Sequence, residues 1–148
     1  PEVGLAQPIL YVHAGLMPEI SDELAKVEGT GAQKAQLLNS VVRDLLKGPA
    51  AEIRAEPSPL LGDAGPFWTR QLALDREDRI CGDLERSLGA FSASRMVVGH
   101  TPQEDGKVHQ RCGGRLVLAD TLISAAYTGV SHPSAVEVAG DGTMTAVY

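Results

Sequence analysis

Long hydrophobic segments are missing from this sequence. The longest uninterrupted apolar runs in its 148 residues are four residues long, as in Ile9–Val12 and Leu116–Ala119. A membrane-spanning helix needs about 20 apolar residues, so none is predicted. The first residues, PEVGLAQPILYVH, also lack the basic region and apolar block of a signal peptide. We therefore expect a soluble protein, and an intracellular location is favoured. Because position 1 is not Met, Pro1 need not be the native start.

An excess of positive charge is also absent. The formal net charge is −6. Residues 1–90 carry nine basic and fourteen acidic side chains, and residues 91–148 carry four and five. A protein that binds nucleic acid or an anionic membrane through its charge presents a basic patch. Neither part of this sequence offers one, so neither partner is expected.

Cysteine is scarce as well. Cys81 and Cys112 lie far apart and form no C-x-x-C pair. Disulfide frameworks are typical of short, cysteine-rich secreted chains, and this composition does not indicate one. The sequence predicts two small buried thiols in a reducing compartment.

What remains is an ordinary globular composition, with 43% apolar and 22% charged residues. A chain of this length can bury a core as one domain. The apolar, β-prone run at residues 9–13 predicts a buried strand. Ser21, followed by Asp22 and Glu23, predicts the N-cap of a short helix that ends at Gly29.

The next segment predicts a longer helix. Thr30 to Gln33 fits a capping box, and six apolar residues follow at helical spacing up to Gly48: Leu37, Leu38, Val41, Val42, Leu45 and Leu46. Residues 48–66 predict a long loop.

The second half predicts a helix at residues 77–90 and a buried strand at Arg95–Gly99. Two hairpins should follow, centred on Gly113-Gly114 and on residues 140–142. The order of strand, helices, strand and antiparallel β predicts a mixed α/β layered fold.

Two histidines follow the two predicted buried strands. His13 precedes Ala14-Gly15, and His100 lies between Gly99 and Thr101-Pro102. Ligand sites of open α/β sheets lie at the carboxyl ends of strands. Histidine is a common metal ligand, and a neighbouring glycine lets backbone or ligand approach closely. Each histidine could instead be a hydrogen-bonded core residue, but their matching settings favour a common cleft.

The full strings YVHAGLMP and RMVVGHTPQ, in that order, resemble two late motifs of the calcineurin-like metallophosphoesterases. VVGHTPQ, CGGRLVLADTLISAAYTG, HPSAVEV and GPFWTR look most like the Shewanella-like protein phosphatase branch. The resemblance spans Tyr11 to Ala139. It implies the C-terminal half of a layered metallophosphoesterase β-sandwich, with helices and a mixed sheet. It also implies a phosphatase that hydrolyses phosphomonoesters, with phosphoproteins as the expected substrates, by attack of metal-activated hydroxide on phosphorus.

Site residues follow from matching these motifs. His13 and His100 would be metal ligands in a centre of two divalent ions (Mn, Fe or Zn). Arg70, in GPFWTR, would contact the phosphate of a phosphorylated substrate through its guanidinium fork. Its alternative role is a surface residue beside a packed Trp68. Asp120 could orient a ligand His through a hydrogen bond or could simply end a strand.

The motifs of the family's first half are absent. D-x-H, G-D-x-x-D-R and G-N-H-[ED] have no counterpart, and the only asparagine is Asn39. A dinuclear centre needs more ligands than two imidazoles. We therefore expect residues 1–148 to be the C-terminal part of a phosphoesterase domain and to be inactive alone. The N-terminal metal-binding half of that domain is absent from this sequence and is the expected partner.

Two alternative functions remain open at this point. An ApaH-like dinucleoside polyphosphate hydrolase shares the VHAG motif. A degenerate phosphatase-like domain could keep its histidines for packing and bind a partner without catalysis. The two remaining histidines, His109 and His132, are expected to be exposed in a hairpin and a loop.

Overall fold

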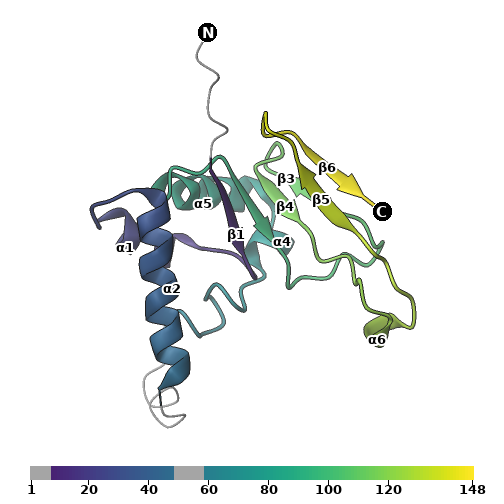
Figure 1. Cartoon of the computed structure of the whole chain (residues 1–148), viewed down its shortest axis with the longest axis horizontal. Coiled ribbons are helices and arrows are strands. Elements are labelled where there is room, and N and C mark those ends of the chain that lie inside the picture. Colours follow the sequence, from purple (N-terminus) through teal and green to yellow (C-terminus); the bar gives the residue numbers. More distant parts are fainter. Residues whose placement is uncertain (1–7, 49–58) are drawn as a thin grey trace.

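The computed structural model describes residues 8–48 and 59–148 (Figure 1). Most of the predicted loop at residues 48–66 lies outside these ranges. Its last residues, 59–66, form a series of turns.

A four-stranded mixed sheet forms the centre of the chain. Its order is β1 (Ile9–Val12), β2 (Arg95–Val98), β4 (Leu116–Leu118) and β3 (His109–Arg111). β1 and β4 both run parallel to β2, whereas β3 returns antiparallel to β4 as the predicted hairpin. Because β1 and β2 are parallel and in register, the residues that follow them emerge at one edge of the sheet.

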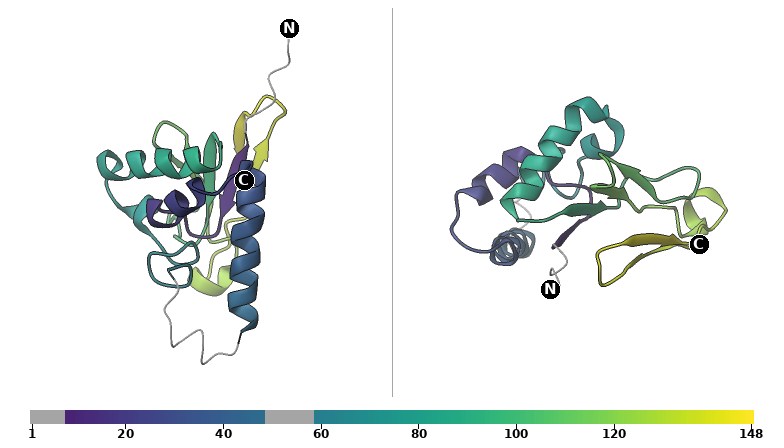
Figure 2. Two further views of the ribbon diagram at one scale, coloured as in Figure 1. Left: turned by 90° about the vertical axis from the view of Figure 1, so that its left-hand side faces the viewer. Right: turned by 90° about the horizontal axis from the view of Figure 1, so that it is seen from above.

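Two helices cover one face of this sheet, and a hairpin lies on the other (Figure 2). They are α1 (Pro18–Ala25) and α5 (Glu77–Ala90), and the hairpin pairs β5 (Ala135–Val138) with β6 (Met144–Val147). Arg95 fixes the hairpin by donating a hydrogen bond of 2.7 Å to the carbonyl oxygen of Gly142.

The predicted start of α1 at Ser21 is wrong. The N-cap is Met17, and Pro18 occupies the first turn, where its fixed φ suits a helix and its missing N–H costs nothing. Ser21 instead lies inside the helix, fully buried, and its hydroxyl makes a 3.0 Å hydrogen bond with that of Ser87 in α5.

The predicted long helix is present as α2 (Gly31–Lys47), and its capping box is confirmed. Gln33 donates its backbone N–H to the Thr30 hydroxyl, and the Thr30 N–H bonds to the Gln33 side chain at 2.8 Å. The apolar stripe is not buried as its periodicity suggests, because Val42 is the only buried residue of the helix. α2 stands beside β1, on the side away from β3 and β4 (Figures 1 and 2).

The core lies between the sheet and the two covering helices. Its fully buried members include Leu84 and Leu88 of α5 and Met96 and Leu116 of the central strands. The predicted burial is confirmed for β2, because strands pair with it on both sides and α1 and α5 cover it. β1 is less buried than predicted, and its Tyr11 is 64% exposed.

The two cysteines are not free thiols, contrary to expectation. Cys81 of α5 and Cys112, which follows β3, form a disulfide. The sequence separation of 31 residues concealed the pairing, because α5 and the β3–β4 turn meet only through the tertiary fold.

The architecture is the mixed α/β class predicted from the order of elements, with short helices α4 (Gln71–Leu74) and α6 (Ala125–Thr128) that were not predicted. Within residues 8–48 and 59–148, no helix has both the length and the apolar character needed to cross a bilayer.

Candidate functional site

The ends of β1 and β2 bring two imidazoles together. His13 follows β1 and His100 follows β2, and the register pairs the last residues of these strands, Val12 with Val98. The His13 Nε2 and His100 Nδ1 atoms lie 3.2 Å apart, and the ring centroids are 4.9 Å apart. The expectation that both point toward a common cleft is confirmed.

The backbone around both histidines is held by hydrogen bonds. The Gly99 N–H donates to the His13 carbonyl oxygen at 2.9 Å, and the Ala14 N–H donates to that of Pro66 at 2.8 Å. His100 itself has φ of 62°, a left-handed conformation that is uncommon outside glycine and is found at functional sites.

The two glycines beside these histidines, Gly15 and Gly99, differ in how much space a Cβ atom would find. Gly15 has φ of 150°, and a Cβ there would meet the Leu72 side chain at 3.0 Å, so close packing does require glycine. Gly99 has no such φ, and an added Cβ would be in ordinary contact, 3.5 Å from the His13 carbonyl oxygen. Contact with the His13 backbone therefore does not require glycine at position 99, and a close approach of a ligand there stays a prediction.

One open pocket contains all four side chains that the sequence singled out. Its volume is about 620 Å³. It is lined by His13, Trp68, Arg70, His100, Pro102, Asp120, Leu122, Ile123, Ser124 and Tyr127. Four segments far apart in the sequence thus converge on the carboxyl ends of the parallel strands, where ligand sites of such sheets lie.

Arg70 connects the turn after Pro66 to this edge of the sheet. Its Nη1 donates a 2.9 Å hydrogen bond to the carbonyl oxygen of His100. The guanidinium is otherwise exposed and makes no other hydrogen bond or ion pair with the described residues. Arg70 therefore braces the left-handed His100 backbone and keeps further N–H donors available for an anion.

The rim of the pocket is apolar and aromatic, which sequence reasoning largely missed. Trp68 is 58% exposed and its ring lies 5.2 Å from that of His100 between centroids. Ile123 and Tyr127 are also exposed, the latter 83%. The motif PFWTR contains Trp68, so the sequence could have identified it. No pattern in the sequence predicts the four-residue helix α6, which carries Tyr127.

The surroundings of His100 favour the neutral form of its imidazole. Desolvation lowers its pKa below the ordinary 6.5, and the positive charge of Arg70 and the His13 ring lower it further. The Trp68 backbone and the Asp120 carboxylate act in the opposite direction. A neutral imidazole is the form that binds a metal ion.

Asp120 lines the pocket but does not orient an imidazole as anticipated. Its Oδ1 accepts a 3.2 Å hydrogen bond from the Leu122 N–H, and its backbone carbonyl accepts one from Gln103. Among the described residues, neither His13 nor His100 bonds to its carboxylate. The His100 Nε2 is buried and makes no well-formed hydrogen bond with them.

The other two histidines lie outside this pocket. His109 is exposed, as expected, and its Nε2 lies 2.9 Å from Asp105 Oδ2. His132 is half-buried rather than exposed, because it packs against Gly106, where a Cβ would lie 2.4 Å from the His132 Nδ1.

The ring nitrogens of His13 and His100 could supply part of the ligand set of one metal ion. Two nitrogens bound to one ion at about 2.0–2.1 Å cannot be more than roughly 4 Å apart, and the 3.2 Å between the imidazoles satisfies this. Over residues 8–48 and 59–148, the one group of three potential ligands within 4.8 Å is Glu77, Cys81 and Cys112. Its sulfurs are joined in the disulfide, and thiolates are needed to bind metal. The imidazole pair therefore needs further ligands.

No protein-family model matches this sequence. An uncharacterised protein of the fission yeast Schizosaccharomyces pombe is 32% identical over 123 residues, which are 80% of this chain and 33% of the relative. An uncharacterised protein of Acanthamoeba polyphaga mimivirus is 29% identical over 105 residues, which are 64% of this chain and 41% of that protein. The chain thus spans about a third to two fifths of the curated relatives it matches.

Solved structures of a cold-active protein tyrosine phosphatase, one from a psychrophilic Shewanella species, share the fold. Two of them match with a TM-score of 0.62 at 23% identity, over 93–95% of this chain and 39–40% of theirs. The chain has the mixed α/β fold of the C-terminal part of that phosphatase.

Proposed function

We propose that this chain supplies part of the active site of a metal-dependent phosphatase of the calcineurin-like type, which hydrolyses phosphomonoesters. His13 and His100 bind one divalent ion, and Arg70 binds the phosphate. Residues 1–148 form the C-terminal part of that catalytic domain. The further ligands of a two-metal centre with Mn, Fe or Zn come from polypeptide outside these residues.

The observation that carries this proposal is the 3.2 Å approach of the two imidazoles in a pocket shared with Arg70. A pair of hydrogen-bonded histidines could serve packing alone. Packing does not, however, account for an exposed guanidinium beside them or for the left-handed backbone of His100. These features suit a site that binds a cation and an anion together.

Each side chain has a distinct task in this mechanism. The metal centre supplies Lewis acidity and activates water when it is bound. The His13 and His100 nitrogens fix its position at the carboxyl ends of β1 and β2. Arg70 orients the phosphate and offsets the negative charge that develops on its oxygens.

The substrate we propose is a phosphorylated protein side chain. The pocket rim exposes Trp68, Ile123 and Tyr127 around Arg70, which suits an apolar group attached to the phosphate. The fold neighbour is a protein tyrosine phosphatase, which supports the same substrate class.

The test uses the full-length polypeptide that is encoded by the reading frame of this sequence. Steady-state kinetics on an aryl phosphate are measured beside metal content by elemental analysis. We expect His100→Ala to lower metal content and to reduce kcat by about 10² or more, because metal-assisted charge stabilisation contributes several kcal/mol.

Arg70→Ala should leave metal content constant while KM, kcat or both worsen. Arg70→Lys should recover only part of the loss, because lysine keeps the charge but lacks the bidentate fork. His109→Ala is the matched control outside the pocket and should retain both metal and activity. Full metal occupancy and normal rates in His100→Ala would refute the assignment.

A further inference from the structure

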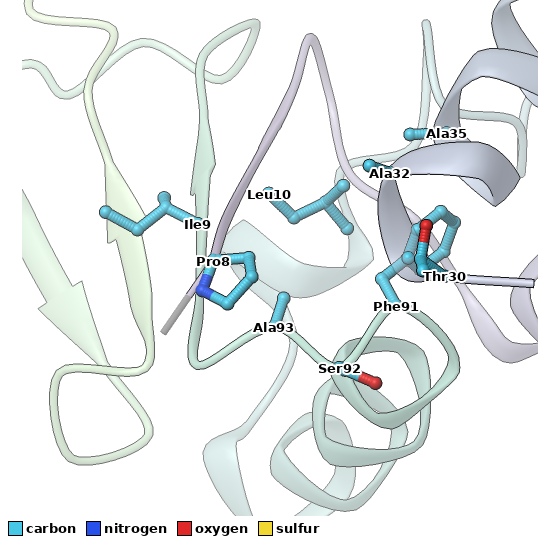
Figure 3. Close-up of a pocket in the computed structure, with 10 residues that line it drawn as sticks. Pro8, Ile9, Leu10, Thr30, Ala32, Ala35, Phe91, Ser92 and Ala93 are labelled. Atoms are coloured by element: carbon cyan, nitrogen blue, oxygen red, sulfur yellow. The ribbon is translucent and has the colours of Figure 1, made fainter. Parts of the chain in front are cut away.

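We propose that Glu77, Cys81 and Cys112 form a separate metal site, which binds one thiolate-seeking divalent cation such as Zn²⁺ after the disulfide is reduced. None of the three residues lines the pocket that holds His13 and His100. Figure 3 shows the apolar pocket between β1 and α2, whose labelled residues include no acid, histidine or cysteine. The proposal does not depend on the proposed function.

Two elements of the fold bring the three ligand atoms together. The two cysteine sulfurs and a carboxylate oxygen of Glu77 all lie within 4.8 Å of one another. Glu77 and Cys81 are four residues apart in α5, a spacing that places both on one face of a helix. Cys112 follows β3 and comes from the turn that faces α5.

The backbone separation of the two cysteines suits a shared metal ion. Their Cα atoms are 5.5 Å apart. Two thiolates that bind one zinc ion at about 2.3 Å in a tetrahedral arrangement lie roughly 3.8 Å from each other. Once the sulfur–sulfur bond is broken, rotation of the Cys81 and Cys112 side chains is enough to reach that separation with the backbone in place.

The Glu77 carboxylate is already directed at the cysteines. Its Oε2 accepts a 3.3 Å hydrogen bond from the Cys112 N–H. The Glu77 side chain is 53% exposed, so the site is open to solvent on this side. Two thiolates, one carboxylate and one water give the four ligands that zinc prefers.

Arg111 balances the charge of such a site. Zinc bound to two thiolates and one carboxylate carries one net negative charge, and the Arg111 Nε lies 3.6 Å from Glu77 Oε1. The guanidinium is held in place by hydrogen bonds to the carbonyl oxygens of Leu72, at 2.8 Å, and Asp75. A nearby cation favours the thiolate form of cysteine, which is the form that binds metal.

The site forms in two chemical steps. A dithiol reductant transfers two electrons and two protons to the Cys81–Cys112 bond, which breaks into two thiols while the reductant becomes a disulfide. Zinc then displaces the two thiol protons and bonds to both sulfurs. Both cysteines are half-buried rather than sealed in the core, so a reductant has access to them. Thiolate ligands select zinc over magnesium or calcium.

The experiment adds Co²⁺ or Zn²⁺ to the 148-residue chain before and after reduction by a dithiol, which is removed without air. Cobalt bound to thiolate has a charge-transfer absorption band in the ultraviolet. The reduced chain should show this band and should bind one more Zn²⁺ than the oxidised chain, which should show no band. Cys112→Ser should abolish the band, and His100→Ala should keep it, which separates this site from the proposed phosphatase centre.

Glu77→Gln tests the third ligand. It should weaken zinc binding by the reduced chain at least about tenfold, which is the effect that loss of even an outer-shell partner has. Glu85→Gln is the matched control, because Glu85 is exposed on the same helix and its carboxylate bonds to Arg115 instead. It should bind zinc like the wild type.

Circular dichroism shows whether the reduced chain is folded. If reduction unfolds it, added Zn²⁺ should restore the spectrum of the oxidised chain, because a ligand of the folded state stabilises that state. A folded reduced chain without the cobalt band overturns the proposal, as does an unfolded one that zinc fails to restore. Equal zinc affinity of Glu77→Gln and the wild type also overturns the three-residue site.

Discussion

His13 Nε2 and His100 Nδ1 lie 3.2 Å apart, although 87 residues separate them in the sequence. The proximity follows from the parallel pairing of β1 with β2, which ends both strands at the same edge. Arg70 reaches the same edge from a third segment and bonds to the backbone of His100. The metal and phosphate roles proposed for these residues depend on this convergence.

The disulfide should contribute substantially to stability. It closes a separation of 31 residues between α5 and the β3–β4 turn. Restricting the unfolded chain in this way contributes on the order of 3–4 kcal/mol. We expect Cys81→Ser, Cys112→Ser and the double variant to lose similar amounts in urea unfolding, and a reductant to destabilise only the wild type. Unchanged unfolding midpoints would show that the bond is not formed in solution.

Two glycines in helices should respond in opposite directions to substitution by alanine. A Cβ at Gly31 would lie 1.8 Å from the Phe91 carbonyl oxygen, whereas at Gly82 it would meet nothing within 4 Å. Gly82→Ala should stabilise by about 0.5–1 kcal/mol through helix propensity. Gly31→Ala should destabilise by about 1–3 kcal/mol, because α2 must move away from Phe91.

Urea unfolding of the two glycine variants provides the measurement. Their chemistry is the same, so the contrast isolates the contact with Phe91. A stabilising effect of both substitutions would mean that the start of α2 does not rest against Phe91 as described.

The pair formed by Asp105 and His109 should show in a carboxyl titration. Hydrogen bonding from His109, followed by that from the Lys107 N–H, lowers the pKa of Asp105 below its ordinary 3.8. A carboxyl with a lowered pKa favours the folded state above 3.8, and that contribution disappears as the pH falls through the folded-state pKa.

His109→Ala should therefore raise the pKa of Asp105 toward 3.8, as measured by NMR titration of the side-chain carboxyl. Metal binding at His13 and His100 should be unchanged in this variant. An Asp105 pKa that stays constant would contradict the contact.

Local patterns predicted most of the fold. Apolar runs located β1 and β2, the capping box located α2, and Gly113-Gly114 located the β3–β4 turn. The approach of His13 and His100 was predictable because each follows a parallel strand. Strand ends are set by short-range patterns, and parallel pairing carries them to one edge.

What the sequence did not reveal depends on tertiary contacts. The Cys81–Cys112 bond forms because α5 packs over the sheet near the β3–β4 turn. α1 begins at Pro18, and Ser21 lies inside the helix, where its hydroxyl pairs with that of the buried Ser87. The apolar stripe on α2 predicted a buried helix face, but the buried fraction of that face depends on what lies beside β1. Asp120 lies in the predicted pocket, yet its carboxylate binds the backbone of its own turn.

The most direct test of the account is a metal titration of the 148-residue chain without reductant, which keeps Cys81 and Cys112 paired. Isothermal calorimetry with Zn²⁺ or Mn²⁺ should give one weak site on the wild type. His13→Ala and His100→Ala should each weaken it by about tenfold or more, and His109→Ala should bind like the wild type. Equal binding by all four proteins, or loss only in His109→Ala, would contradict the assignment of His13 and His100 as a metal-binding pair.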